Sequence, residues 1–300
     1  MKFANLHLHS MYSDGVLTPK ELCKKAKAMG YGAISLTDHY TDAGTDAIAK
    51  AADAVGLSYI RGMECTGLDE NGTSFHIVAY DFDPTANGIA SYIKRYHENA
   101  LITMEAKVKK MLGDGVISGI VWQDVLDAFP SDVWLCNEHI FFVLCQKAGY
   151  DQTGYWDYIK RFHGAKVDTP KLIKPSAEQM IRDIVDAGGV ASLAHPHHQT
   201  QYLPKLYAMG LRCVEIDHPD IDAKDASEAL AFARNHGMYV SGGTDHTGRL
   251  ANHSWQRGDQ PGRAERVAAM GETVPLANNT EVFSGVSEAD FLALKNRIYG

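Results

Sequence analysis

Short apolar segments alternate with longer amphipathic segments along most of the chain. In residues 2–9, Leu6 and Leu8 fall on one side of the segment, and His7 and His9 fall on the other. This alternation with a period of two predicts a β-strand. Bounded apolar runs predict further strands over residues 33–37, 57–64, 74–80, 190–194, 211–216 and 238–241.

Helix signals separate these strands. Thr18 and Glu21 have the spacing of a capping box, with Pro19 at the first helical position, and Ser287 opens a last helix with the same spacing to Asp290. Other helices are predicted over residues 176–187, 201–209 and 223–235. Repeated strand–helix units predict parallel strands with right-handed crossovers, arranged as an α/β barrel or an open sheet.

The pattern changes in the middle of the chain. Between about residues 92 and 174 it becomes helical and rich in aromatic residues, and we interpret this range as a helical insertion that forms a lid beside the site. Residues 248–279 show little apolar periodicity and are predicted to form a long loop. The chain is therefore predicted to be a single domain, residues 1–300, with a helical insertion over 92–174.

The composition argues against membrane-spanning, secreted and nucleic-acid-binding proteins. Of the 300 residues 45% are hydrophobic, but no run of eighteen apolar residues predicts a membrane span. The first residues lack the apolar region of a signal peptide, and the five cysteines include no CxxC pair. Both features favour a cytoplasmic location and argue against a disulfide framework or a cysteine zinc site. The net charge of −8 argues against a nucleic-acid polymer as partner.

Histidine and carboxylate side chains recur at the ends of the predicted strands. The chain has 14 histidines, and the strand-end positions are those of His9, His39, Glu64, His195 and Asp245. The carboxyl ends of the strands are where α/β barrels place their active sites. We therefore expect these side chains to meet at one end of the fold.

The pair His7 and His9 has two interpretations when it is considered alone. Both imidazoles lie on one strand face, where they could share a cation or face solvent. The surrounding chain favours the cation, because His76 lies in an apolar strand and an unpartnered imidazole there costs free energy. Glu64 supplies a carboxylate that could bridge two ions. Imidazole and carboxylate ligands without thiolates suit Zn, Mn or Fe.

The ordered motifs HLHS, SDG, TDH, GME, FHIVAY, AHP and GGTDH resemble the PHP (polymerase and histidinol phosphatase) family, a relative of the amidohydrolases. The resemblance covers essentially the whole chain and is strongest to stand-alone phosphoesterases with a helical insertion. It implies a distorted (β/α)7 barrel that binds two or three divalent ions (Mn, Zn or Fe), with Glu64 as a bridge. The implied ligands in chain order are His7, His9, Asp14, His39, Glu64, His76, His195 and Asp245.

The last motif departs from the family pattern. That motif normally reads D-x-H, whereas here His246 follows Asp245 directly and Thr247 stands at the usual histidine position. His246 is expected to be the remaining ligand, with His253 as its alternative. A weaker third site is the other interpretation.

The resemblance implies a metal-dependent phosphoesterase whose clustered ions generate hydroxide near neutral pH. The expected substrate is a small phosphorylated molecule: a nucleotide such as AMP, a bisphosphate or a sugar phosphate. Glu64 and Asp245 are expected to be catalytic, and Asp245 or His197 is expected to handle protons. The candidates for substrate contacts are His139, Arg161, Lys171 and His198. For the insertion residues, the alternative is that they are ordinary surface groups.

Other functions remain open from the sequence. A cyclic phosphodiesterase would open a ribose cyclic phosphate and then release phosphate. An amidohydrolase would cleave a C–N bond, but no lysine is placed to form a carbamate bridge between ions. A non-catalytic PHP module is disfavoured by the nearly complete ligand set.

Overall fold

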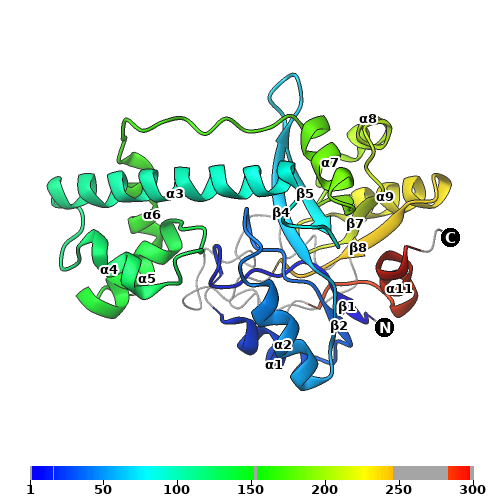
Figure 1. Ribbon diagram of the computed structural model, residues 1–300, viewed down its shortest axis with the longest axis horizontal. Helices are drawn as coiled ribbons and strands as arrows, with labels where there is room; N and C mark the ends of the chain where they lie inside the picture. The colour runs from blue at the N-terminus through cyan, green and yellow to red at the C-terminus, as the bar shows by residue number, and fades with distance from the viewer. Residues whose placement is uncertain (1, 16, 152–153, 246–282, 298–300) are drawn as a thin grey trace.

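The computed structural model describes residues 2–15, 17–151, 154–245 and 283–297 (Figure 1). Within these ranges the strands form two sheets. The first sheet is parallel and has the order β1 (Ala4–Asn5), β2 (Ala33–Ile34), β3 (Ser58–Tyr59). The second has the order β4 (Gly62–Leu68), β5 (Ser74–Tyr80), β6 (Val190–Leu193), β7 (Cys213–Asp217), β8 (Tyr239–Gly242).

Hydrogen bonds join the two sheets in two places. The backbone N–H of Leu6, just after β1, donates to the carbonyl of Gly242 at the end of β8 over 2.9 Å. At β4, the N–H of Glu64 donates to the carbonyl of Thr37, in the segment that continues from β2, over 3.2 Å. The strands therefore close into a barrel-like ring, and the predicted α/β class is confirmed.

Helices cover the outside of this ring and begin where the sequence places capping residues. Thr18 forms the predicted capping box at the start of α1 (Pro19–Ala28), and the hydroxyls of Ser176 and Ser287 cap α7 (Ala177–Asp186) and α11 (Glu288–Asn296). The helices of this part of the fold are α1 (Pro19–Ala28), α2 (Thr45–Val55), α7 (Ala177–Asp186), α8 (Leu203–Ala208), α9 (Ala223–Asn235) and α11 (Glu288–Asn296). A short 3-10 helix, η2 (Thr200–Tyr202), precedes α8.

Two predictions about the strands were wrong. The predicted strand 57–64 is divided between β3 and β4, which lie in different sheets. The expectation of parallel strands fails for β5, which runs antiparallel to both β4 and β6. The cause is the tight turn after β4, where Asp69 accepts the N–H groups of Asn71 and Thr73 and Gly72 has a φ of +82°. A turn this short can join only antiparallel strands.

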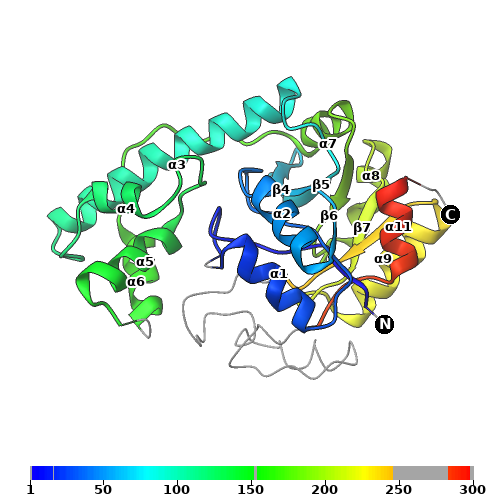
Figure 2. The same ribbon diagram turned by 60° about the horizontal axis from the view of Figure 1, so that its bottom comes forward.

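The middle of the chain forms a helical extension with its own apolar core. It contains α3 (Asn87–Gly113), α4 (Trp122–Ala128), α5 (Asn137–Ala148) and α6 (Tyr155–Gly164). Figures 1 and 2 show α3 leading from the sheets to the group formed by α4, α5 and α6. The helical stretch begins at Asn87, before the predicted start of the insertion at residue 92, and the chain returns to the ring at Ser176, which bridges Leu68 of β4.

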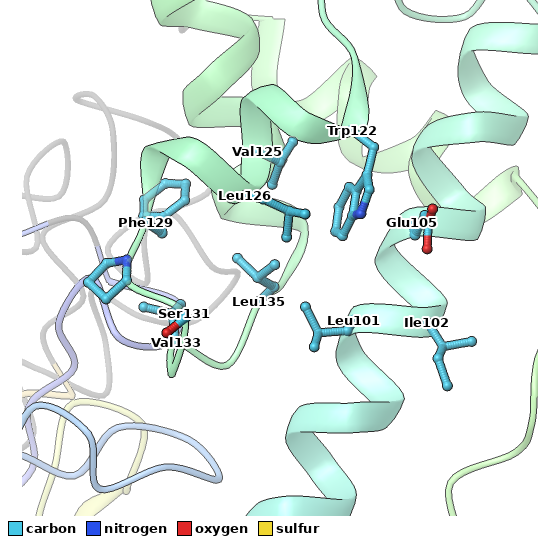
Figure 3. Close-up of a pocket in the computed structure, with 11 residues that line it drawn as sticks. Leu101, Ile102, Glu105, Trp122, Val125, Leu126, Phe129, Ser131, Val133 and Leu135 are labelled. Atoms are coloured by element: carbon cyan, nitrogen blue, oxygen red, sulfur yellow. The ribbon is translucent and has the colours of Figure 1, made fainter.

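An apolar pocket of about 410 Å³ lies within this extension, between α3 and α4 (Figure 3). Its walls include Leu101 of α3, Trp122 of α4 and Phe129. None of the described helices has both the length and the hydrophobicity needed to cross a membrane. The predicted loop over 248–279 lies outside the described residues.

Candidate metal centre

Glu64 of β4 lies at the middle of a group of imidazoles. The side chain is 1% exposed, and each carboxylate oxygen faces a different set of histidines. Oε2 lies 3.3 Å from Nε2 of His7, 3.3 Å from Nε2 of His9 and 3.2 Å from Nδ1 of His39. A single carboxylate thus faces three ring nitrogens through one oxygen, which is more than ordinary hydrogen bonding would require.

The second oxygen of Glu64 faces the other two imidazoles. Oε1 lies 2.7 Å from Nδ1 of His76 on β5 and 3.0 Å from Nε2 of His195. His195 lies two residues after the end of β6. His76 therefore has the polar partner that its position in an apolar strand requires. The side chains of His76 and His195 are 35% and 21% exposed, so the group opens to solvent on this side.

His7 and His9 follow β1 and are both 0% exposed. The interpretation of this pair as residues on a solvated strand face is therefore wrong. The turn that follows them is held by the buried carboxylate of Asp38, which accepts the Ser10 N–H at 2.7 Å and the Ser10 and Ser13 hydroxyls at 2.6 Å. These bonds fix the backbone that carries both histidines.

Asp245 reaches the same group from the end of β8. Its Oδ1 lies 3.0 Å from Nε2 of His9 and 3.8 Å from Nε2 of His7, and its N–H donates to the His7 carbonyl over 2.9 Å. The approach requires a glycine two residues earlier, because a Cβ on Gly243 would lie 2.4 Å from the backbone nitrogen of His7. The GGTD sequence is thus explained by close packing of β8 against the start of the chain.

Several ring nitrogens in this group are buried without a hydrogen bond among the described residues. They are Nε2 of His7, Nε2 of His9, Nδ1 of His39 and Nε2 of His218. Buried polar atoms normally find partners, and three of these four face the Oε2 atom of Glu64 at about the spacing of a shared cation. The donor set of imidazoles and carboxylates fits divalent zinc, manganese or iron.

Two residues that were not predicted from the sequence contact the ligands on the side away from Glu64. Glu215 of β7 lies 3.3 Å from Nδ1 of His7 through both oxygens and accepts the His195 N–H at 2.7 Å. A carboxylate on Nδ1 places the proton there and leaves Nε2 of His7 as a free ligand atom. Glu215 lies near the end of a predicted strand, and that same positional signal would have found it.

His218 is the second missed residue. Its Nδ1 accepts the N–H of Asp220 at 3.0 Å, so in the neutral ring Nε2 carries the hydrogen. That Nε2 lies 3.3 Å from Oδ2 of Asp245. His218 therefore lies against the Asp245 carboxylate, at a distance without the geometry of a hydrogen bond, and it joins His7 and Glu215 as a third group of potential ligand atoms.

Burial and neighbouring charges act in opposite directions on the pKa values of this group. Burial opposes protonation of His7, but the carboxylates of Glu215, Glu64 and Asp245 outweigh it and raise the pKa of His7 to about 10. Burial also works against ionisation of Glu64 and Asp245, yet the surrounding imidazoles hold both pKa values well below normal. Burial lowers the pKa of His39 to about 4. The ionised carboxylates and neutral His39 are in the state that cation binding needs, whereas His7 must lose its proton when an ion binds.

The other predicted ligands lie at the edge of the group or outside the described residues. Oδ1 of Asp14 lies 3.2 Å from Nδ1 of His9, and ligand atoms of His9, Asp14 and His39 fall within 4.8 Å of one another. The structure thus brings Asp14 and His39 to one place. His246 lies outside the described residues, as does His253.

The predicted substrate contacts lie elsewhere. Both ring nitrogens of His139 are engaged, with the Cys136 N–H at 3.1 Å and the Met11 carbonyl at 3.0 Å, so this residue links α5 to the turn after β1. Arg161 is exposed and pairs with Asp157 over 2.8 Å. Lys171 lies exposed in the stretch after α6, while His197 and His198 contact Asp225 rather than Glu64.

Replacing Glu215 by Gln is expected to lower metal affinity by about 10–100-fold, the usual effect of changing a group that orients a metal ligand. The neutral amide cannot hold the Nδ1 proton of His7 as firmly as the carboxylate does. Activity should return when excess metal is supplied, which a titration of activity against free metal would measure. Unchanged affinity would contradict the assigned role.

Comparisons with known proteins agree with this geometry. A model of the PHP domain family matches residues 5–189. The chain is 26% identical to the phosphoribosyl 1,2-cyclic phosphate 1,2-diphosphodiesterase of Eggerthella lenta, over 82% of this chain and 94% of that protein. It is 27% identical to the 3′,5′-nucleoside bisphosphate phosphatase of Chromobacterium violaceum, over 80% of this chain and 86% of that protein.

A solved structure is also similar to this chain. A protein from Bifidobacterium adolescentis that is assigned as a metal-dependent phosphoesterase superposes with a TM-score of 0.70 at 26% identity, covering 83% of this chain and 89% of its own. The family match spans more than half of the chain and includes the strands that carry Glu64 and His76. The chain therefore belongs to the PHP domain family, and it is a metal-dependent phosphoesterase of that family.

Proposed function

We propose that the protein hydrolyses the phosphate ester of a small molecule: a nucleotide such as AMP, a nucleoside bisphosphate or a sugar phosphate. The observation that carries the proposal is the two-sided arrangement around Glu64. Three imidazoles face one carboxylate oxygen and two face the other. A carboxylate flanked in this way is suited to bridge two cations, the arrangement used to clamp a phosphoryl group.

We assign the ligands by the oxygen of Glu64 that they face. On the Oε2 side, His7, His9 and Asp245 would hold one ion. On the Oε1 side, the second would be held by His76 and His195. A third would lie between Asp14 and His39. Two or three ions of Mn, Zn or Fe, when bound, would supply an activated water and polarise the phosphoryl oxygens.

The protein's own residues orient the reaction and handle the proton. Asp245 is the carboxylate that we assign to accept a proton from the attacking water, because its Oδ1 atom faces the ligand group and its Oδ2 atom lies 3.3 Å from Nε2 of His218. Substrate would enter on the side of His76 and His195, whose rings are the more exposed. Nearby, the ring of Trp134 lies 6.0 Å from that of His39, so the helical extension forms one wall of the site.

A second candidate is the opening and further hydrolysis of a ribose cyclic phosphate. It is supported by the Eggerthella lenta relative, whose name states action on a 1,2-cyclic phosphate and which matches over 94% of its length. The same ligand group would serve both reactions, since each one places a water on phosphorus. The two candidates differ in substrate and not in the residues that hold the ions.

The experiment is phosphate release by the full-length protein loaded with Mn or Zn. The panel contains AMP, a nucleoside 3′,5′-bisphosphate, ribose 5-phosphate, a ribose 1,2-cyclic phosphate and a short oligoribonucleotide. Release from one or more of the first three substrates is expected, with the highest kcat/KM among them. Activity on the cyclic substrate alone would favour the second candidate. Failure of every substrate with either ion would overturn the proposed function.

A further inference from the structure

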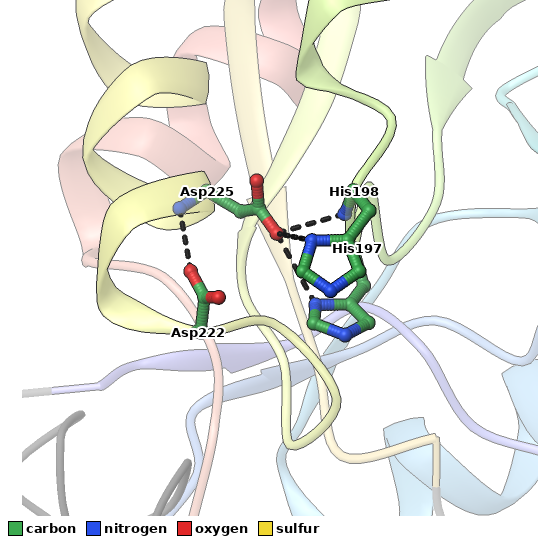
Figure 4. A group of neighbouring side chains, drawn as sticks. All are labelled: His197, His198, Asp222 and Asp225. Carbon is green, nitrogen blue, oxygen red and sulfur yellow. Dashed lines mark hydrogen bonds and ion pairs between the residues drawn. The ribbon is translucent and has the colours of Figure 1, made fainter.

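A second group of ligand-type side chains lies apart from Glu64, where the loop after β6 meets the start of α9 (Figure 4). It contains His197 and His198 from the loop, and Asp222 and Asp225 from the helix start. One potential ligand atom from each of the four lies within 4.8 Å of the others. These residues are not used by the proposed hydrolysis.

The contacts converge on Asp225. Its Oδ2 lies 3.2 Å from Nδ1 of His197 and 3.6 Å from Nδ1 of His198, and it accepts the backbone N–H of His198 at 2.8 Å. Asp222 is the N-cap residue of α9, and its Oδ1 accepts the Asp225 N–H at 2.8 Å. Figure 4 shows both imidazoles turned towards the Asp225 carboxylate.

The charges of this group favour a cation. Asp225 is 3% exposed, so its carboxylate is held almost completely out of water, and an uncompensated buried charge is costly. The rings of His197 and His198 lie 3.7 Å apart, and Nδ1 of each is directed at the same Asp225 oxygen. A divalent ion among the four side chains would supply positive charge beside the buried carboxylate.

We propose that His197, His198, Asp222 and Asp225 bind one divalent transition-metal ion, separate from the ions of the Glu64 centre. Two imidazole nitrogens and two carboxylate oxygens are a four-ligand set that zinc accepts in tetrahedral geometry. The ion would tie the loop after β6 to the start of α9. Because His195 lies two residues before His197, this attachment would also limit the movement of a ligand of the Glu64 centre.

Two substitutions remove ligands while preserving the local backbone. His198 has a φ of +55°, a conformation that asparagine tolerates better than most residues, so His198→Asn removes the imidazole with little strain. Asp222→Ser removes the carboxylate but keeps a side-chain oxygen to cap α9. The matched control is His236→Asn, which changes an exposed histidine at the other end of the same helix.

The measurement is the number of zinc ions per full-length chain after equilibrium dialysis at micromolar free zinc. We expect His198→Asn and Asp222→Ser each to bind one ion fewer than the unchanged protein, and His236→Asn to bind the same number. Equal numbers in the unchanged protein and in His198→Asn would overturn the proposal. So would an additional ion that appears only at millimolar zinc.

The Glu64→Gln background separates this site from the catalytic one. Zinc that remains bound in that variant should be lost when His198→Asn is added, whatever the outcome of the substrate panel. If the double variant binds as much zinc as Glu64→Gln alone, the remaining ion is not held by this group and the proposal fails.

Discussion

Replacing Glu64 by Gln is expected to remove the ions of the Glu64 centre, leaving any ion held by His197, His198, Asp222 and Asp225, and to lower phosphate release by about a thousandfold or more. The carboxylate faces five imidazoles through its two oxygens, and a neutral amide cannot bridge two cations there. Charge stabilisation by metal ions contributes several kcal/mol to a transition state, and each ~1.4 kcal/mol corresponds to a factor of ten in rate. Metal content by mass spectrometry and kcat/KM for the best substrate measure the two losses.

The matched control is Glu70→Gln, the same chemical change in the turn between β4 and β5. Glu70 is exposed and pairs with Lys205, so this variant should retain metal and full activity. Full activity in Glu64→Gln would refute the bridging role. A loss in both variants would show that the effect is not specific to the centre.

Chelation is expected to abolish activity and to lower the melting temperature by about 10 °C at pH 8. At a free ion concentration about a thousandfold above Kd, one site stabilises the folded chain by about 4 kcal/mol, and each kcal/mol moves the midpoint by roughly 2–4 °C in a large domain. Thermal unfolding with and without EDTA measures the shift. An unchanged melting temperature with full activity would contradict metal binding at Glu64.

The same experiment should depend on pH in a defined direction. Without metal, the pKa of His7 is raised to about 10, so its contribution to stability is complete below about 6.5 and is lost as pH rises towards 10. With metal, His7 must be neutral, so protons compete with the ion and affinity rises with pH. The melting temperatures with and without EDTA should therefore differ more at pH 8 than at pH 6. A smaller difference at pH 8 would contradict this competition.

Elements with strong local signals could be predicted from the sequence. The helix 223–235 and the strand 74–80 have the predicted limits, because each is bounded by capping or turn residues and has a consistent apolar period. The range 57–64 was predicted as one strand, although Arg61 and Gly62 interrupt its apolar residues. Its division between two sheets depends on which partner each half pairs with, and that is decided by distant residues.

The candidate ligands could also be predicted from local sequence signals. Strand-end positions identified Glu64, His195 and Asp245, and the structure brings these side chains into one group. Glu215 and His218 were missed although they lie at the end of a predicted strand, because no family motif drew attention to them. The hydrogen bonds that engage His139, and those that turn His197 towards Asp225, depend on contacts that no local pattern specifies.

The closure of the ring between β1 and β8 has a consequence for biogenesis. Asn5 donates from its side chain to the Thr244 hydroxyl, 239 positions later in the chain, and His7 and Asp245 meet across the same junction. A ribosome makes residues from the N-terminus onward, so the first histidines are synthesised long before the last carboxylate exists. The ligand set that combines His7, Glu64 and Asp245 is therefore complete only after residue 245 has been synthesised. An ion that requires all three side chains can bind only after β8 has been made.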